Sequence, residues 1–193
     1  MDFVFVLLAY LAGSIPFGLI LTNIWGKGNL RSSGSGNIGA TNVFRTHGTM
    51  LGLLTFFLDF LKGFLVCKYF GCENETASLL LIAVPVLGHI YSPWLKWRGG
   101  KGVATYLGVV GALNPSALFC STLVWWTVFA IVRISSVASI ASVLFACAFF
   151  YHLSPFSCNF INQLYVLITL AVIIVWKHHD NLKQLLNGKK SSP

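Results

Sequence analysis

Charged residues are scarce in this 193-residue chain. Only 9% of its residues are charged and 56% are hydrophobic, whereas soluble domains carry about 25% charged residues. This composition excludes an ordinary soluble domain. The formal net charge of +8 does not indicate nucleic acid as a partner, because basic residues also collect on the cytoplasmic side of membrane proteins. The expected partner is instead the lipid bilayer.

Paired cysteines and metal-ligand clusters are also missing. The five cysteines form no CxxC pair, and His, Cys and carboxylates show no metal-ligand spacing. We therefore expect neither a metal nor another cofactor, and we interpret the cysteines as small apolar packing residues. The N-terminus has no basic segment before its first apolar run, so that run is predicted to be a span and not a cleaved signal peptide. Without a linker or visible repeat, residues 1–193 are predicted to form a single membrane domain.

Long apolar runs dominate the chain. A transmembrane helix needs about 20 mostly apolar residues, and six runs approach that length. A shorter run over 103–113 ends at Asn114-Pro115, a turn signal. We therefore predict an all-α integral membrane protein with seven transmembrane helices, of which the fourth is short. The predicted spans are 3–22, 50–70, 76–92, 103–113, 117–132, 135–152 and 160–176.

The basic residues test this count. Seven spans place eleven of the thirteen Lys and Arg residues on one side, whereas Asp2, Glu73 and Glu75 fall on the other side with Lys68. The positive-inside rule then puts the N-terminus outside and the C-terminus in the cytoplasm. Six spans would break this alternation. The predicted cytoplasmic segments are the loops 23–49 and 93–102 and the C-terminal segment 177–193.

The first cytoplasmic loop is rich in glycine and in hydrogen-bond donors. Gly34, Gly36 and Gly39 fall within six residues and would let several N–H groups point inward as a nest for an anion. Polar side chains from the same stretch add donors, and the last of them adds a fixed charge with a bidentate fork: Ser35, Asn37, Thr41, Asn42 and Arg45. The glycine spacing also matches a dinucleotide-binding pattern, but no βαβ unit surrounds it. A flexible polar loop is the alternative.

The second cytoplasmic loop is a basic glycine-rich turn. Gly99, Gly100 and Gly102 surround Lys101, and the chain then enters a predicted helix, whose first N–H groups and positive dipole end favour phosphate. The alternative is a basic topology anchor, which would explain the cations but not the glycines.

Further polar groups reach the same side. Ser136, Ser139 and Ser142 form a stripe beside Arg133, although serines also simply pack between membrane helices. Beyond Lys177, His178 and Asn181 share one face of a predicted interfacial helix.

Ionisable residues also occur within the predicted spans. His89 lies near the cytoplasmic end of the third span, and Asp59 and Lys62 lie within the second at a spacing of three. Such groups are either functional or form a structural ion pair.

The sequence also lacks one common catalytic motif for acyl transfer, which limits the possible chemistry on the cytoplasmic side. No histidine has an aspartate five residues later, so the His-x-x-x-x-Asp dyad of many acyltransferases is missing. Two glycine-rich loops with several cations suit two phosphates or one highly charged head group. Catalysis would rest on positioning and charge stabilisation, which suits an activated donor.

Several motifs closely resemble the bacterial acyl-phosphate:glycerol-3-phosphate acyltransferase family. They are Gly13-Ser-Ile-Pro-Phe-Gly18, Gly34-Ser-Gly-Asn-Ile-Gly-Ala-Thr-Asn-Val-x-Arg45, Asp59-Phe-Leu-Lys-Gly63, Gly88-His89 and Gly99-Gly-Lys-Gly-Val-Ala-Thr105. The resemblance implies a seven-helix inner-membrane enzyme with its active site facing the cytoplasm. It would transfer a fatty acyl group from acyl phosphate to the 1-hydroxyl of glycerol 3-phosphate, giving lysophosphatidic acid and orthophosphate in phospholipid biosynthesis. A functional link to the soluble enzyme that makes acyl phosphate follows.

The resemblance and the residue patterns together define a predicted site. The predicted catalytic residues are Ser35, Arg45, Lys101, His178 and Asn181. The predicted substrate-binding residues are Gly36, Asn37, Gly39, Thr41, Asn42, His89, Gly99, Gly100, Gly102, Arg133, Ser139, Ser142 and Lys177. The chain departs from the family pattern at His179 and Asp180, where a basic residue and Glu are usual.

Two other functions remain open at this point. A transporter for organophosphate anions could use the short fourth helix beside a basic loop as a half-helix site. Against it, the cations gather at one face and no inverted repeat is visible. A non-catalytic lipid-binding scaffold would explain the basic face but not the glycine-rich loops.

Overall fold

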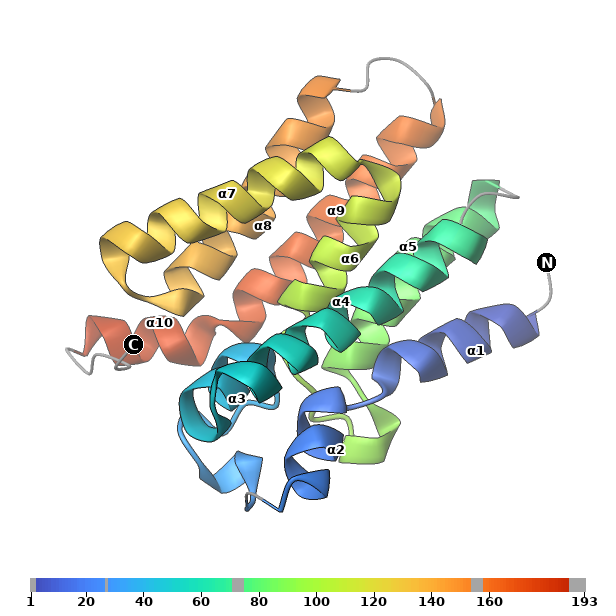
Figure 1. The fold of residues 1–193 in the computed structure, drawn as a ribbon. Helices are drawn as coiled ribbons and strands as arrows, with labels where there is room; N and C mark the ends of the chain where they lie inside the picture. Colours follow the sequence, from blue (N-terminus) through green and yellow to red (C-terminus); the bar gives the residue numbers. More distant parts are fainter. Residues whose placement is uncertain (1–2, 27, 71–74, 154–157, 188–193) are drawn as a thin grey trace.

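The computed structural model describes residues 3–26, 28–70, 75–153 and 158–187. Every regular element in these ranges is helical (Figure 1), as predicted. The elements are α1 (Phe3–Ser14), α2 (Phe17–Ile24), the 3₁₀ turn η1 (Leu30–Ser32), α3 (Ala40–His47), α4 (Thr49–Phe70), α5 (Glu75–Ile90), the 3₁₀ turn η2 (Pro93–Leu95), α6 (Val103–Leu113), α7 (Pro115–Val132), α8 (Ser135–Leu153), α9 (Cys158–Lys177) and α10 (His179–Leu186).

Four of the described helices, α4, α7, α8 and α9, are long and apolar enough to cross a membrane alone. The span predicted over 3–22 is not one straight helix, because α1 and α2 meet at an angle of 47°. Pro16 explains the bend, since proline lacks an N–H group and its ring clashes with the preceding turn of a helix. Taken together, the bent pair is long and apolar enough to form one span, and α5 and α6 are shorter apolar helices. The turn at Asn114-Pro115 is confirmed, because the Asn114 side chain accepts a hydrogen bond from Ala117 N (2.9 Å) and caps α7.

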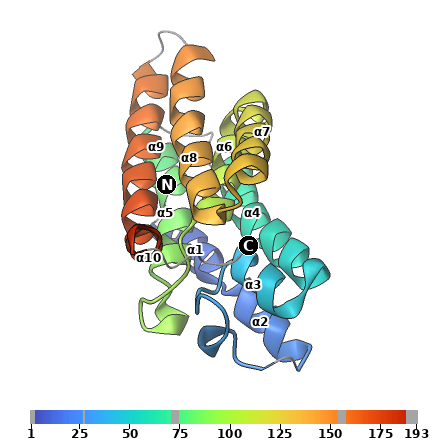
Figure 2. The same ribbon diagram turned by 90° about the vertical axis from the view of Figure 1, so that its left-hand side faces the viewer.

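The helices run back and forth along one long axis. α4 packs on α6, α1 on α5 and α7 on α8. Glycines permit the closest of these approaches: a methyl group on Gly63 would overlap with the Thr105 carbonyl, and one on Gly13 with the Pro85 backbone. The loop before α4, the loop between α5 and α6, the α7–α8 turn and α10 gather at one end of the molecule, opposite the start of α1 (Figures 1 and 2). This end carries the predicted site.

A small apolar core underlies the first loop. Leu30, Ile38 and Val43 from the loop and α3 are buried against Leu21 of α2 and Leu51 of α4. This packing gives the polar glycine-rich segment a fixed support, because the apolar side chains would lose burial if the loop moved.

Candidate functional site

Asn42 organises the first loop. Its Oδ1 accepts from the backbone N–H of Ser35 (2.9 Å), and its Nδ2 donates to the carbonyls of Asn37 (2.8 Å) and Ser33 (3.1 Å). The side chain is buried, so its amide satisfies the backbone where the loop makes no regular structure. Asn42 therefore shapes the loop from below, on the side away from solvent.

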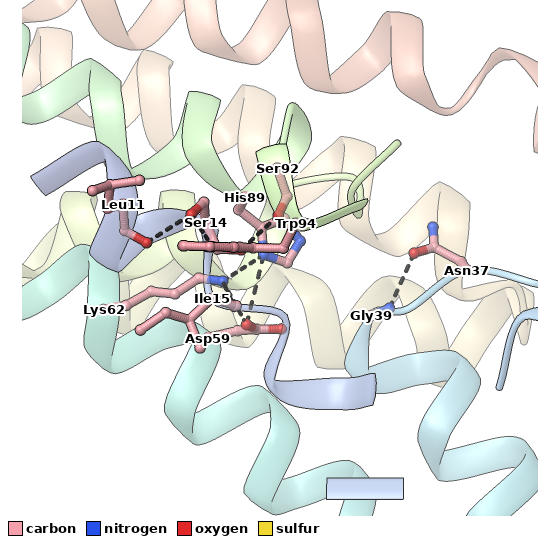
Figure 3. Close-up of polar contacts among 10 residues, drawn as sticks. All are labelled: Leu11, Ser14, Ile15, Asn37, Gly39, Asp59, Lys62, His89, Ser92 and Trp94. Carbon is pink, nitrogen blue, oxygen red and sulfur yellow. Dashed lines mark hydrogen bonds and ion pairs between the residues drawn. The ribbon is translucent and has the colours of Figure 1, made fainter. Parts of the chain in front are cut away.

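The glycines of this loop play unequal parts. Gly34 and Gly36 have positive φ angles (57° and 68°), which favour glycine, whereas Gly39 has an extended backbone (φ −74°) as the N-cap of α3. Asn37 Oδ1 accepts from Gly39 N (3.0 Å), as Figure 3 shows. The expected three-glycine turn thus consists of two left-handed glycines and one asparagine-stabilised turn.

Several donors of the first loop remain open to a ligand. Ser35 and Thr41 are exposed, and neither hydroxyl has a hydrogen-bond partner within the described ranges. Arg45, on the last turn of α3, is half-buried, and its Nε is buried without a protein acceptor among the described residues. A buried guanidinium N–H normally has an acceptor. These groups can therefore take an anion without first giving up a protein contact.

The first and second loops are joined directly. One Arg31 guanidinium nitrogen donates to the carbonyl of Arg98 (2.6 Å). The second loop then folds back on α5, because Gly99 N donates to the Ile90 carbonyl and Gly100 N to the His89 carbonyl, each at 3.0 Å. These two glycine N–H groups are occupied, so a ligand must use donors from Lys101 onward.

The start of α6 supplies such donors. The first helical bond here runs from Tyr106 N to Gly102 O (2.8 Å), and the N–H groups before Tyr106 lack an acceptor inside the helix. Gly102 is the N-cap with φ 89°, a left-handed conformation suited to glycine. It turns the loop so that Lys101 stands beside the helix start.

Lys101 is joined to the C-terminal helix. Its Nζ donates to Oδ1 of Asn181, which brings the second loop against α10. Burial lowers the pKa of Lys101 to about 8, and the charge of Asp180 opposes this shift. The lysine therefore carries a charge at neutral pH but loses it at mildly alkaline pH.

His178 lies in the same corner and is buried between α9 and α10. Its Nδ1 lies 2.8 Å from the Ile174 carbonyl. Since a carbonyl can only accept, Nδ1 carries the proton and Nε2 is the acceptor of the neutral ring. Burial, and secondly the charge of Lys101, lower the pKa of His178 to about 4. At neutral pH this corner thus combines a neutral imidazole with a neighbouring ammonium group.

The neighbours of His178 have contacts of their own. The Lys177 ammonium lies over the Tyr91 ring, 4.5 Å from its centre. His179 and Asp180 pair with each other, because His179 Nε2 lies 2.9 Å from Asp180 Oδ1 on the exposed side of α10. This pair faces away from the buried His178.

Two of the three serines in the stripe, and Arg133, form contacts between or within helices, whereas the buried Ser136 hydroxyl has no hydrogen-bond partner among the described residues. The Trp125 indole N–H donates to the Ser139 hydroxyl (3.1 Å), and the Ser142 hydroxyl donates to the Ser121 carbonyl (2.9 Å), both from α7 to α8. Arg133 is exposed and its Nε donates to the Ala130 carbonyl (3.2 Å). These contacts fit the packing alternative better than a direct ligand contact.

A buried polar cluster lies beneath the second loop. Lys62 Nζ lies 2.8 Å from Asp59 Oδ1 and 2.8 Å from His89 Nδ1, and it donates to the Ile15 carbonyl (3.0 Å). Figure 3 shows these side chains directed at one another. The sequence placed Asp59 and Lys62 as a pair but did not predict that His89 and the α1–α2 bend would join them.

Contacts around the bend were also missed. Ser92 donates from its hydroxyl to the Ser14 carbonyl (2.8 Å), and the Trp94 indole N–H donates to the Ser14 hydroxyl (2.7 Å; Figure 3). The Ser92-Pro93 step is a turn signal, but no sequence pattern links it to Ser14. Across the described ranges, no group of three or more His, Cys, Asp or Glu residues could hold a metal ion.

Known proteins match this chain over nearly its whole length. Residues 3–188 match the family description "Glycerol-3-phosphate acyltransferase". A protein of that name from Wolbachia pipientis subsp. Culex pipiens is 44% identical over 194 residues, covering 97% of this chain and 96% of the relative. The Aquifex aeolicus protein of the same name is 41% identical over 189 residues, covering 96% and 95%.

A solved structure shares the fold as well. The crystal structure of PlsY (YgiH), described as an integral membrane glycerol 3-phosphate acyltransferase in its glycerol 3-phosphate form, aligns with a TM-score of 0.87 at 40% identity. It covers 96% of this chain and 92% of that chain. With the apolar helices described above, this makes the chain a multi-pass integral membrane protein. It belongs to the glycerol-3-phosphate acyltransferase family.

Proposed function

We propose that this protein transfers a fatty acyl group from acyl phosphate to the 1-hydroxyl of glycerol 3-phosphate. The hydroxyl oxygen attacks the acyl carbonyl carbon, and the bond between that carbon and the phosphate oxygen breaks. Its electron pair leaves with orthophosphate, and lysophosphatidic acid is the other product. The reaction would serve phospholipid biosynthesis.

The contact between Lys101 and Asn181 is the observation that carries the proposal. It brings the N-terminus of α6 and the C-terminal helix together around one ammonium group, with His178 beside it. Helix N–H groups, a cation and neutral polar side chains make a site for a phosphorylated substrate. Membership of the glycerol-3-phosphate acyltransferase family supports acyl transfer as the reaction at this site.

The first loop would bind the phosphate of the other substrate. Arg45 offers a planar fork without a protein acceptor at Nε, and Ser35 offers an exposed hydroxyl. Two such sites suit a reaction in which both donor and acceptor carry a phosphate. Each cation would also offset the charge that develops on the leaving phosphate.

A protein base is not required in this mechanism. Acyl phosphate already contains a good leaving group. His89 Nδ1 faces the Lys62 ammonium, and Asp59 is paired with the same lysine, so neither group is available for a proton. A pKa of about 4 also makes His178 a weak base at neutral pH. We therefore assign His178 to substrate positioning, and the acceptor's own phosphate dianion can take the proton.

The proposal includes a place in the cell. The loops and α10 would lie on the cytoplasmic side of the inner membrane, because Lys and Arg residues gather at this end and the positive-inside rule assigns such an end to the cytoplasm. A soluble enzyme that makes acyl phosphate would supply the donor from the same side.

The deciding experiment is donor-dependent phosphate release by purified protein. Acyl phosphate with glycerol 3-phosphate should release orthophosphate and form lysophosphatidic acid in equal amounts. Acyl phosphate alone should release little. Acyl-coenzyme A or an acyl-carrier-protein thioester in place of acyl phosphate should give no product; efficient use of either would contradict the proposed donor. A transporter would instead move the phosphate ester across vesicle membranes without forming any product.

A further inference from the structure

We propose that Asp59 and Lys62 are positioning residues which hold His89 as a neutral ring with its proton on Nε2, and that this ring supports Gly100 in the second loop. The inference rests on the proposed function, because it assigns the loop to glycerol 3-phosphate. The three side chains are at least 93% buried, and their role extends the site into the membrane helices.

Lys62 has three close polar neighbours, two of them hydrogen-bond acceptors and one an ion-pair partner. An ammonium group carries three N–H bonds and no acceptor. Two of those bonds meet the Ile15 carbonyl at 3.0 Å and His89 Nδ1 at 2.8 Å, and Nζ forms an ion pair with Asp59 Oδ1 at 2.8 Å. The charge of the lysine is balanced by Asp59, so the cluster is neutral overall in a region where water is scarce, although Asp59 Oδ1 accepts no hydrogen bond from the described residues.

The donors of Lys62 determine the tautomer of His89. Two N–H groups cannot face each other at 2.8 Å, so His89 Nδ1 must be the acceptor of the Lys62 bond. The longer separation of 3.6 Å between His89 Nδ1 and Asp59 Oδ1 agrees with a ring that donates nothing to the carboxylate. In the neutral ring the proton then lies on Nε2.

The Nε2 edge of His89 faces the second loop. A methyl group at Gly100 would overlap with Nε2 and the adjacent ring carbons, so the ring lies directly against this glycine. The main chain adds a second link, because Gly100 N donates to the His89 carbonyl (3.0 Å). Rotation of the ring would therefore displace Gly100, which immediately precedes Lys101.

The same lysine ties this support to the α1–α2 bend. The Ile15 carbonyl is a backbone acceptor near the helix break, and Lys62 satisfies it. One charged pair thus sets the position of the bend, of His89 and of the second loop together.

The first test is a pair of double-mutant cycles on the apparent KM for glycerol 3-phosphate. His89→Ala opens the space that Gly100→Ala requires, so the double variant should have a KM at least about fivefold below the product of the single effects. Gly99→Ala is the matched control, because its methyl group would meet the backbone carbonyls of His89 and Ile90. His89→Ala should give it no relief. Multiplicative effects in both cycles would overturn the proposal.

The second test needs no active enzyme. Nitrogen magnetic resonance of ring-labelled protein in bilayers, with the His89 signal assigned by its loss in His89→Gln, should show a proton on Nε2 and none on Nδ1. In Asp59→Asn/Lys62→Met, which leaves no unpaired buried charge, the proton should move toward Nδ1. A protonated Nδ1 in the parent protein would overturn the proposal even if the enzyme is active. Correct protonation in a protein that makes no lysophosphatidic acid would instead count against the proposed function alone.

Discussion

Lys101 and His178 lie in one corner of the molecule, and burial acts on both in the same direction. It lowers the pKa of each because a charged form is disfavoured away from water. The result is nonetheless different at neutral pH: the lysine keeps its charge and the histidine has none. The two residues should therefore respond to pH in separate ranges.

Lys101 predicts that binding of glycerol 3-phosphate weakens at alkaline pH. A pKa of about 8 means that the ammonium, present below this pH, is lost above it, well before an ordinary lysine would titrate. The apparent KM for glycerol 3-phosphate should rise about tenfold per pH unit above 8. In Lys101→Arg the guanidinium stays charged, so steady-state kinetics should show a flat KM to higher pH. An identical limb in that variant would assign the titration to another group.

His178 predicts no comparable change of activity with pH near neutrality. His178 is neutral above a pH of about 4, and we assign it to positioning. His178→Gln should therefore keep measurable turnover and the pH profile of the parent, whereas loss of a base would cost about 10²–10⁴-fold. Loss of turnover at unchanged acceptor affinity, with recovery in added imidazole, would make His178 the base.

Arg45 predicts a loss that charge alone cannot restore. Arg45→Lys keeps the charge but not the planar fork. A hydrogen bond to a charged group contributes about 1.5–3 kcal/mol, so kcat/KM for glycerol 3-phosphate should fall about 10- to 150-fold. Near-normal kinetics would leave Arg45 with a topological role only.

Among the elements, the second loop has a left-handed glycine, Gly102, directly before α6. Gly102→Ala forces an L-residue to φ 89°, a left-handed conformation that costs roughly 1–2 kcal/mol, and should raise the KM for glycerol 3-phosphate about tenfold. Gly28→Ala controls for the backbone angle alone, because Gly28 has φ 87° with open space around it, whereas a methyl group at Gly102 would also crowd Ile90 and Val86. Similar KM changes in both variants would point to general strain.

The helices could be predicted from sequence more readily than the site contacts. Apolar runs and the Asn114-Pro115 turn define most helix ends because they depend on local chemistry. Pro16 could have predicted the bend, but the long apolar run around it favoured a single span over 3–22. The roles of Asn42 and Lys62 could not be predicted, since their partners lie on other segments and become neighbours only through packing. The substrate-binding role of the hydrogen-bond donors in the first loop stays a prediction, which the variants test.

At the scale of the whole molecule, the arrangement predicts which surfaces face each compartment. Tyr69, in the last turn of α4, and Leu186, the last residue of α10, are both exposed. The C-terminal end of α4 and the helix α10 lie at opposite ends of the molecule (Figure 1). In intact cells, a membrane-impermeant thiol reagent should label Tyr69→Cys but not Leu186→Cys, after comparison with the parent's own cysteines. The reverse labelling would invert the proposed orientation.

The bend between α1 and α2 also has a consequence for biosynthesis. Its carbonyls at Ile15 and Ser14 accept from Lys62 and Ser92, which follow them in the chain by 47 and 78 residues. A ribosome makes the bend long before it makes these donors, and a bare carbonyl is costly in lipid. We therefore expect α1 and α2 to stay hydrated, or unbent, until α5 and the loop that follows it have been synthesised.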